Sequence, residues 1–292
     1  MKTTFRRALL ALSVVLFAAA CGDDADPAVQ ATTTTAAADV PTAIVSLSPT
    51  STEVLFAIGA GDQVVAVDDQ SNHPEDAPIT DLSGYQPNLE AIVSYEPDLV
   101  VVSSSDPAIV DGLESLGIDV VIHEAAVELD DVYDQIEELG ELTGHLPEAT
   151  ALVEDMRVSI EAIAAGAGDR SLTAYWELDP TYYSVTGNTF IGTLLSIVGI
   201  NSIADDAQDS SDYPQLSAEF IVAADPDLIL LADTKCCGQT LETVAARDGW
   251  GRMKAVTDGH VIALDDDVAS RWGPRVVELL QVLDEAAAKA AA

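Results

Sequence analysis

Two adjacent cysteines, Cys236 and Cys237, have the type and spacing that most directly suggest chemistry in this sequence. In an oxidising compartment such a pair either closes a strained vicinal disulfide or remains as two thiols, and we expect the disulfide. Metal binding is less favoured, because adjacent thiolates fit one ion badly and no third soft ligand is evident. The pair follows a strand predicted at Leu228 to Leu231, so it should lie at the carboxyl end of a sheet, where it could form a rigid apolar surface under a ligand.

The third cysteine, Cys21, ends an export signal of the lipoprotein type. Three basic residues precede an apolar run from Ala8 to Ala20, and three small residues stand directly before the cysteine. This pattern is typical of a signal that is cleaved before a lipid-modified cysteine; an ordinary signal with an incidental cysteine is the alternative. We expect residues 1–20 to be removed and lipid on Cys21 to anchor an extracytoplasmic protein to the cell membrane.

Composition limits the remaining function classes. Residues 21–41 are rich in Asp, Thr, Ala and Pro without a periodic apolar face, which predicts a flexible linker.

The 50 acidic residues outnumber the 12 Lys and Arg, giving a formal net charge of −38. Such a surface repels phosphate backbones and anionic lipids, so we do not expect nucleic-acid binding. A solvated acidic surface is a sufficient explanation of the charge.

An internal repeat indicates the elements that position these residues. The segment EAIVSYEPDLVVV, Glu90 to Val102, recurs 129 residues later as EFIVAADPDLILL, Glu219 to Leu231. Asn88 and Ser217 are N-cap residue types, so each glutamate should take the second helical position, and each Pro-Asp should end a short helix before a buried strand. The chain is therefore predicted to be one α/β lobe built twice.

A long helix should join the two lobes. Apolar residues recur at helical spacing from Leu152 to Ile163, and glycines follow. We predict an α/β fold of two lobes, each with a central, mainly parallel sheet flanked by helices, joined by a single long backbone helix. The predicted divisions are an N-terminal lobe at 42–143, the connecting helix at 144–168 and a C-terminal lobe at 169–292. A single stiff connection predicts small closure.

Several local predictions concern the segments around the strands. Ser48-Pro49 should open a helix in which Thr50 and Glu53 have capping-box spacing. Asp68 to Tyr85 has the punctuation of a long loop. The segments ADTKCCGQT and DDDVASRWGPR are predicted to be loops at strand ends, where α/β proteins usually bind ligands.

Longer segments resemble a known family. The sequences IVSLSPTSTEVLFAIGAGDQVVAV, YQPNLEAIVSYEPDLVVV, YPQLSAEFIVAADPDLILL and GWGRMKAVTDGHVIALD, with the late GPR, resemble the helical-backbone substrate-binding proteins of ABC importers for vitamin B12, haem and ferric siderophores. The resemblance covers residues 42 to about 285. It implies a monomeric extracytoplasmic receptor without catalysis or a cofactor of its own, which delivers a metal chelate to a homodimeric permease with its ATPase.

The resemblance implies a docking role for Glu90 and Glu219, because they match acidic residues that dock into Arg-lined permease pockets in the family. Equivalent carboxylates on duplicated lobes also suit a two-fold symmetric partner. The alternative is stabilisation of the helix dipole by a glutamate in the first turn, worth about 0.5 kcal/mol.

The resemblance also implies ligand contacts from residues on the cleft side. Tyr85 falls where cobalamin-binding members carry a Trp, and Tyr213 matches another cleft aromatic position. The full set is His73, Tyr85, Tyr182, Tyr183, Tyr213, Arg271 and Trp272, with Cys236 and Cys237 beside them. Half-buried packing is the alternative for each tyrosine. No Lys or Arg occurs between Arg7 and Arg157, which disfavours an anionic catecholate and favours cobalamin or another corrinoid, with other ferric siderophores or haem as alternatives.

Two other functions remain open on the sequence. A receptor for bare zinc or manganese needs converging His and carboxylates, whereas His73, His123, His145 and His260 are isolated. A secreted hydrolase is the more remote alternative, because the sequence has no Gly-x-Ser-x-Gly, no HExxH and no Gly-rich phosphate loop.

Overall fold

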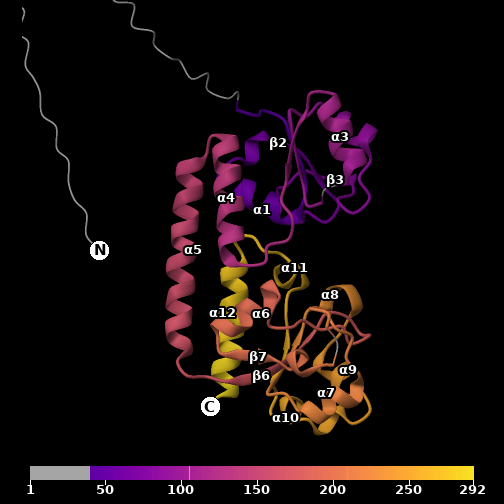
Figure 1. The fold of residues 1–292 in the computed structure, drawn as a ribbon, viewed down its shortest axis with the longest axis vertical. Coiled ribbons are helices and arrows are strands. Elements are labelled where there is room, and N and C mark those ends of the chain that lie inside the picture. Colours follow the sequence, from indigo (N-terminus) through magenta and orange to yellow (C-terminus); the bar gives the residue numbers. More distant parts are fainter. Residues whose placement is uncertain (1–39, 105, 209) are drawn as a thin grey trace, which may run out of the picture. The chain divides into compact units, whose positions relative to one another are not determined.

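Residues 40–104, 106–208 and 210–292 are described by a computed structural model (Figure 1). The predicted signal peptide at 1–20, Cys21 and all but the last two residues of the predicted linker lie outside the described residues. Within the described ranges, no helix has the length and apolar character needed to cross a membrane.

A parallel five-stranded sheet forms the centre of the first lobe. Its strand order is β3-β2-β1-β4-β5, and every neighbouring pair is parallel. All four residues of β1 and of β4 are buried, as expected for strands covered on both faces. The elements are β1 (Ile44–Leu47), α1 (Pro49–Ala57), η1 (Gly61–Gln63), β2 (Val64–Asp68), β3 (Ile79–Leu82), α2 (Leu89–Val93), β4 (Leu99–Val102), α3 (Pro107–Ser115), β5 (Asp119–Ile122) and α4 (Leu129–Thr143).

A parallel four-stranded sheet, ordered β7-β6-β8-β9, forms the centre of the second lobe. The order β2-β1-β4-β5 of the first sheet is therefore repeated, with β3 added at one edge. The elements are β6 (Leu172–Glu177), α6 (Phe190–Ile197), β7 (Ile200–Ser202), η2 (Ile203–Asp206), α7 (Ala218–Ala224), β8 (Leu228–Leu231), α8 (Thr234–Cys237), α9 (Leu241–Ala245), η3 (Trp250–Arg252), α10 (Lys254–Thr257), β9 (Val261–Ala263), α11 (Asp266–Ala269) and α12 (Val276–Ala290).

The repeated segments adopt the same local structure. Asn88 caps α2 by accepting from the Ala91 N–H, and Ser217 caps α7 by accepting from the Phe220 N–H. The acidic residue before each proline has a left-handed backbone, with φ of 52° in the first copy and 45° in the second. The predicted α/β fold with two parallel sheets is confirmed.

The carboxylates at the ends of the repeats also have equivalent roles. Asp98 accepts hydrogen bonds from the backbone N–H groups of Thr42 and Ala43 just before β1, and Asp227 accepts from the Thr173 N–H in β6. Partial burial raises the pKa of Asp98, but these hydrogen bonds outweigh it and lower that pKa overall. Each aspartate therefore fastens its own strand to the strand beside it.

Helix α5 (Leu146–Ala167) follows the last helix of the first lobe and precedes the first strand of the second. Figure 1 shows it running beside α4 for one part of its length and beside α12 for another, and both helices pack against it. One apolar core includes residues of both sheets and of α4, α5 and α12. We keep the predicted division into lobes around 144–168 as a proposal.

Four local predictions were wrong. The predicted loop from Asp68 to Tyr85 contains β3, an edge strand with three of its four residues not buried, so it lacks the apolar run that predicts a strand. The predicted loops after β8 and β9 contain the short helices α8 and α11. The capping box at Thr50 and Glu53 is absent: Ser48 caps α1 by accepting from the Ser51 N–H, and Glu53 contacts distant arginines.

Candidate functional site

A pocket of about 110 Å³ lies between residues of the two lobes, beside the carboxyl ends of their parallel strands. The predicted residues Tyr213, Arg271 and Trp272 all border it. The other residues that border it were not among the predicted site residues and are mostly small or apolar: Ala125, Ala126, Phe190, Ile191, Leu194, Ala269, Ser270 and Leu279. The sequence placed Phe190 at the start of a predicted helix, but no local pattern distinguishes a pocket residue of this kind from a residue of the apolar core.

A residue of the first lobe holds the Trp272 side chain in place. Its indole Nε1 donates to Oε1 of Gln135 on α4 at 3.0 Å. Pockets that enclose drug-sized ligands have volumes of roughly 300–1,000 Å³, so this pocket is too small to enclose such a ligand. A macrocyclic ligand would have to extend beyond it, with the pocket receiving one edge.

The loop after β6 and the segment before α7 are paired with each other. The Ser184 N–H donates to the Pro214 carbonyl, and the Leu216 N–H donates to the Tyr182 carbonyl, each at 3.0 Å. Tyr183, 41% exposed, lies in the same ladder, and Tyr213, 50% exposed, comes directly before Pro214. The backbone thus holds two exposed tyrosines on one framework.

The structure places Tyr182 in other surroundings. Its ring stacks on Trp250, with centroids 5.6 Å apart and planes inclined by 28°, and the Arg247 guanidinium lies 5.5 Å from the ring centroid. Tyr182 borders a separate pocket of about 480 Å³ that also includes Glu219. It therefore does not join Tyr213 and Trp272 in the inter-lobe pocket.

Two predicted ligand contacts lie in the first lobe outside the inter-lobe pocket. Tyr85, which follows β3, is 91% exposed. His73 is exposed and precedes Pro74 through a cis peptide bond. Contact of these side chains with a ligand stays a prediction.

Arg271 borders the pocket, but its guanidinium is bound within the protein. Nη1 donates to Glu53 Oε1 at 2.7 Å, and Nη2 donates to the Gln70 carbonyl at 2.8 Å and to Asn72 Oδ1 at 2.9 Å. Arg275 donates from Nε to Glu53 Oε2 at 2.9 Å. Glu53 is 3% exposed, so one buried carboxylate in the first lobe holds two arginines from the segment after β9. This network fastens the lobes together.

A second set of polar contacts positions the cysteine helix. One carboxylate, that of Asp266, accepts from the backbone N–H groups of Thr234, Lys235 and Cys236 at 2.8–2.9 Å. The sulfur atoms of Cys236 and Cys237 are paired as a disulfide, and both residues are exposed. α11 thus holds the first turn of α8, and the sulfur pair lies at the carboxyl end of β8.

Contacts between the loop after β2 and α11 extend this network. Asn72 Nδ2 donates to Asp267 Oδ2 at 3.1 Å, and Lys235 Nζ donates to the same oxygen at 2.7 Å. Arg271 Nη2 donates to the other oxygen of Asp267, Oδ1, at 3.1 Å, so Lys235, Asn72 and Arg271 meet at one carboxylate between the lobes.

Glu90 and Glu219 occupy the second position of α2 and of α7, and both are exposed. Within the described ranges, neither carboxylate has a hydrogen bond or ion pair to another side chain. The two acids are therefore available to an external partner, while their docking role stays a prediction.

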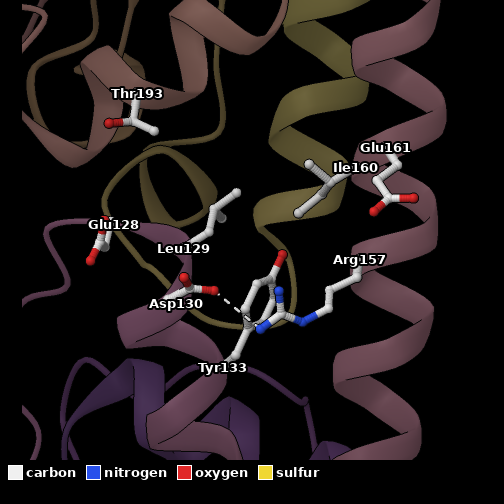
Figure 2. A pocket seen from close by; sticks show the side chains of 8 residues that line it. All are labelled: Glu128, Leu129, Asp130, Tyr133, Arg157, Ile160, Glu161 and Thr193. Carbon is white, nitrogen blue, oxygen red and sulfur yellow. Dashed lines mark hydrogen bonds and ion pairs between the residues drawn. The ribbon is translucent and has the colours of Figure 1, made fainter.

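A third pocket, of about 320 Å³, lies where α4, α5 and α6 meet (Figure 2). Figure 2 shows the Arg157 guanidinium over the ring of Tyr133, with the carbon 4.0 Å from the centroid, and its ion pair to Asp130 at 3.1 Å. These contacts join the start of α4 to the middle of α5.

The buried histidine has a structural explanation. His123 is 3% exposed, with Nε2 at 3.2 Å from Glu138 Oε2 and Nδ1 at 3.4 Å from the Ser51 hydroxyl. Burial lowers the pKa of His123 despite the opposing effect of Glu138, so the ring is neutral near pH 7. Among the described residues, no group of three or more His, Cys, Asp and Glu is placed to hold a metal ion.

Comparisons with known proteins agree with this architecture. The family model described as periplasmic binding protein matches residues 44–268. An uncharacterized ABC transporter substrate-binding lipoprotein of Bacillus subtilis is 32% identical over 84% of this chain and 79% of its own length. A cobalamin-binding protein of Halobacterium salinarum is 32% identical over 82% of this chain and 67% of its own. The structure of a periplasmic haem-binding protein of Vibrio cholerae, 20% identical, matches 83% of this chain and 97% of its own with a TM-score of 0.75, which shows similarity of fold.

Proposed function

Because this chain belongs to the periplasmic binding protein family, we propose that it captures a metal chelate outside the cytoplasm and delivers it to an ABC permease. Cobalamin or another corrinoid is the preferred ligand. The observation that carries the proposal is the inter-lobe pocket bordered by Phe190, Tyr213 and Trp272, which offers flat apolar contact to one edge of a macrocycle. A cobalamin-binding relative at 32% identity supports the choice.

The charges at the pocket support a neutral or weakly charged ligand. Arg271 is the basic residue that borders it, and its guanidinium already binds Glu53. A highly anionic catecholate normally binds to free cationic side chains. Haem and ferric hydroxamates remain the ligand classes against which corrinoids must be compared.

Tryptophan fluorescence titration of residues 41–292 with cobalamin, haem, a ferric hydroxamate and a ferric catecholate tests the ligand class. Trp176 and Trp250 are fully buried and Trp272 borders the pocket, so Trp272 should dominate the response. Tyr213→Ala should weaken cobalamin binding about tenfold, since a buried aromatic contact is worth about 1.5 kcal/mol or more. Tyr95→Ala, which removes a comparably exposed ring outside the pocket, is the matched control. Tightest binding to the catecholate would contradict the proposal.

The proposed partners are a homodimeric permease with its ATPase and, through lipid on Cys21, the membrane. Glu90 and Glu219 are the proposed docking residues, and their exposure at equivalent helix starts supports this role. Two such sites engaged together with partial desolvation can contribute a few kcal/mol to docking.

Replacement of both docking residues by Ala should abolish uptake and permease association while leaving ligand affinity and folding intact. Single replacements should be intermediate. A double Ala variant of the exposed Glu114 and Glu242 controls for lost surface charge. Normal uptake by the Glu90 and Glu219 variant, or loss of its ligand binding in isolation, would refute the assignment.

A further inference from the structure

Beneath α8 lies a buried ionic cluster that the proposed function does not use. Glu177, the last residue of β6, has no exposed surface, and both its oxygens accept from Arg247: Oε2 from Nη1 at 2.5 Å and Oε1 from Nη2 at 2.6 Å. Nη2 of Arg247 also donates to Gln239 Oε1 at 2.7 Å. The Arg247 guanidinium thus neutralises Glu177, and these contacts occupy both Nη1 and Nη2 of Arg247.

Asp233 adds a second carboxylate to this cluster. It lies two residues after β8 at the N-cap of α8 and has no exposed surface. Neither of its carboxylate oxygens has a hydrogen-bond partner among the described residues. A buried ionised carboxylate without donors is strongly destabilising, so the group must either carry a proton or hold an ion.

The groups that face Asp233 favour a proton. These are Glu177 and Tyr175 on β6 and Arg247 after α9, with Tyr182 next to the guanidinium. Burial, then the negative charge of Glu177, raises the pKa of Asp233 to about 7, while Arg247 lowers it by less. With Arg247 already balancing one carboxylate, a single proton makes the cluster neutral, whereas a divalent ion would leave an excess of positive charge.

We propose that Asp233 is protonated in the folded protein and donates its hydrogen to Glu177, so that one proton completes a neutral cluster that holds α8 in place. The proton is taken up from solvent when the protein folds below about pH 7 and returns to solvent above that pH, so no other bond forms or breaks. Loss of the proton leaves two negative carboxylates, Glu177 and Asp233, under α8. Because Asp233 is the N-cap of α8, their repulsion should loosen the helix that carries Cys236 and Cys237.

Arg247 of the same cluster also borders a second pocket. The Arg247 guanidinium lies 4.5 Å from the Trp250 ring centroid, and these residues border the pocket that contains Glu219. One protonated cluster therefore supports both α8 and the surface beside Glu219. It does not depend on which ligand the protein binds.

The pH dependence has a defined sign. The pKa of Asp233 is about 7 in the folded protein and about 3.9 when unfolded, so the folded state binds one more proton between these values. Each unit of rising pH in that window lowers the folding equilibrium constant about tenfold. Above about pH 7 the contribution stays lost, and below about pH 4 it is fully present.

Urea unfolding of residues 41–292 between pH 4.5 and 8.5 tests this for the wild type, Asp233→Asn and the exposed control Asp248→Asn. Asn has no titrating proton and an amide that can donate to Glu177. From pH 5 to 6.5, the slope of the logarithm of the folding constant against pH should be more negative by about one in the wild type than in Asp233→Asn. The control should keep the wild-type slope. Parallel slopes for wild type and Asp233→Asn would overturn the proposal.

Two measurements remain decisive if Asp233→Asn does not fold. Infrared spectroscopy of the folded wild type should show the carbonyl absorption of a buried protonated carboxyl group at pH 6 that disappears by pH 9. Hydrogen exchange, corrected for the intrinsic pH effect, should show that the α8 amides lose protection over the same range while the β8 amides do not. Absence of the protonated band, or unchanged α8 protection, would refute the proposal.

Discussion

Replacing Glu53 by Ala should destabilise the protein more than removal of any surface charge, because Glu53 is the buried carboxylate that holds two arginines across the lobes. Its side chain is 2% exposed, and those of Arg271 and Arg275 are 7% and 15% exposed. Removing one partner of a buried pair leaves an uncompensated charge and costs about 3–5 kcal/mol.

The structure sets this cost at the lower end of the range. After the substitution, Arg271 still donates to the Gln70 carbonyl, Asn72 and Asp267, whereas Arg275 loses the acceptor of its Nε and of Nη2. We expect about 3 kcal/mol for Glu53→Ala. Glu53→Gln should cost less, because the amide oxygen still accepts one hydrogen bond.

Urea unfolding followed by circular dichroism measures the loss as a shift of the midpoint at unchanged slope. The matched control is Asp130→Ala, which breaks the Arg157 ion pair, whose partners are 46% and 70% exposed. An exposed pair contributes about 0–1 kcal/mol. A Glu53→Ala loss that does not exceed that of the control would refute the argument that this network fastens the lobes.

Three further predictions concern single groups. Cys236 and Cys237 should be oxidised to each other in the exported protein, and two alkylatable thiols without reduction in mass spectrometry would contradict this. Burial lowers the pKa of His123, so stability should fall as pH drops below about 6.5, where the unfolded state takes up the proton first; urea unfolding of His123→Gln should lack this slope. Asp98→Ala should lose about 1–2 kcal/mol of unfolding free energy with its backbone hydrogen bonds, and because the pKa of Asp98 is lowered, the loss relative to wild type should shrink as pH falls below about 4.

The sequence predicted what local patterns determine. Asn88 and Ser217 were expected as caps, and the structure shows them capping α2 and α7, because capping depends on a side chain and a backbone N–H three residues later. The buried runs at β4 and β8 were likewise found, since a parallel strand covered on both faces must be apolar throughout. The repeat by itself therefore predicted two α/β lobes.

Edges and short helices escaped the same reasoning. β3 is stabilised by pairing with β2, and the Thr80 hydroxyl donates to the Val67 carbonyl at 2.7 Å, so its own residues carry little apolar signal. The first turn of α8 depends on Asp266, which follows it by about thirty residues. A pattern within a window cannot report a partner outside that window.

Only the tertiary structure decided the roles of the buried charges. Glu53 had the spacing of a local cap, yet its partner Arg271 lies 218 residues away. Tyr182 and Tyr213 were expected in one cleft, but the first packs on Trp250 and the second borders the inter-lobe pocket. Which polar groups meet depends on how two sheets pack around a shared core, and each contact combines residues whose separation in sequence carries no local signal.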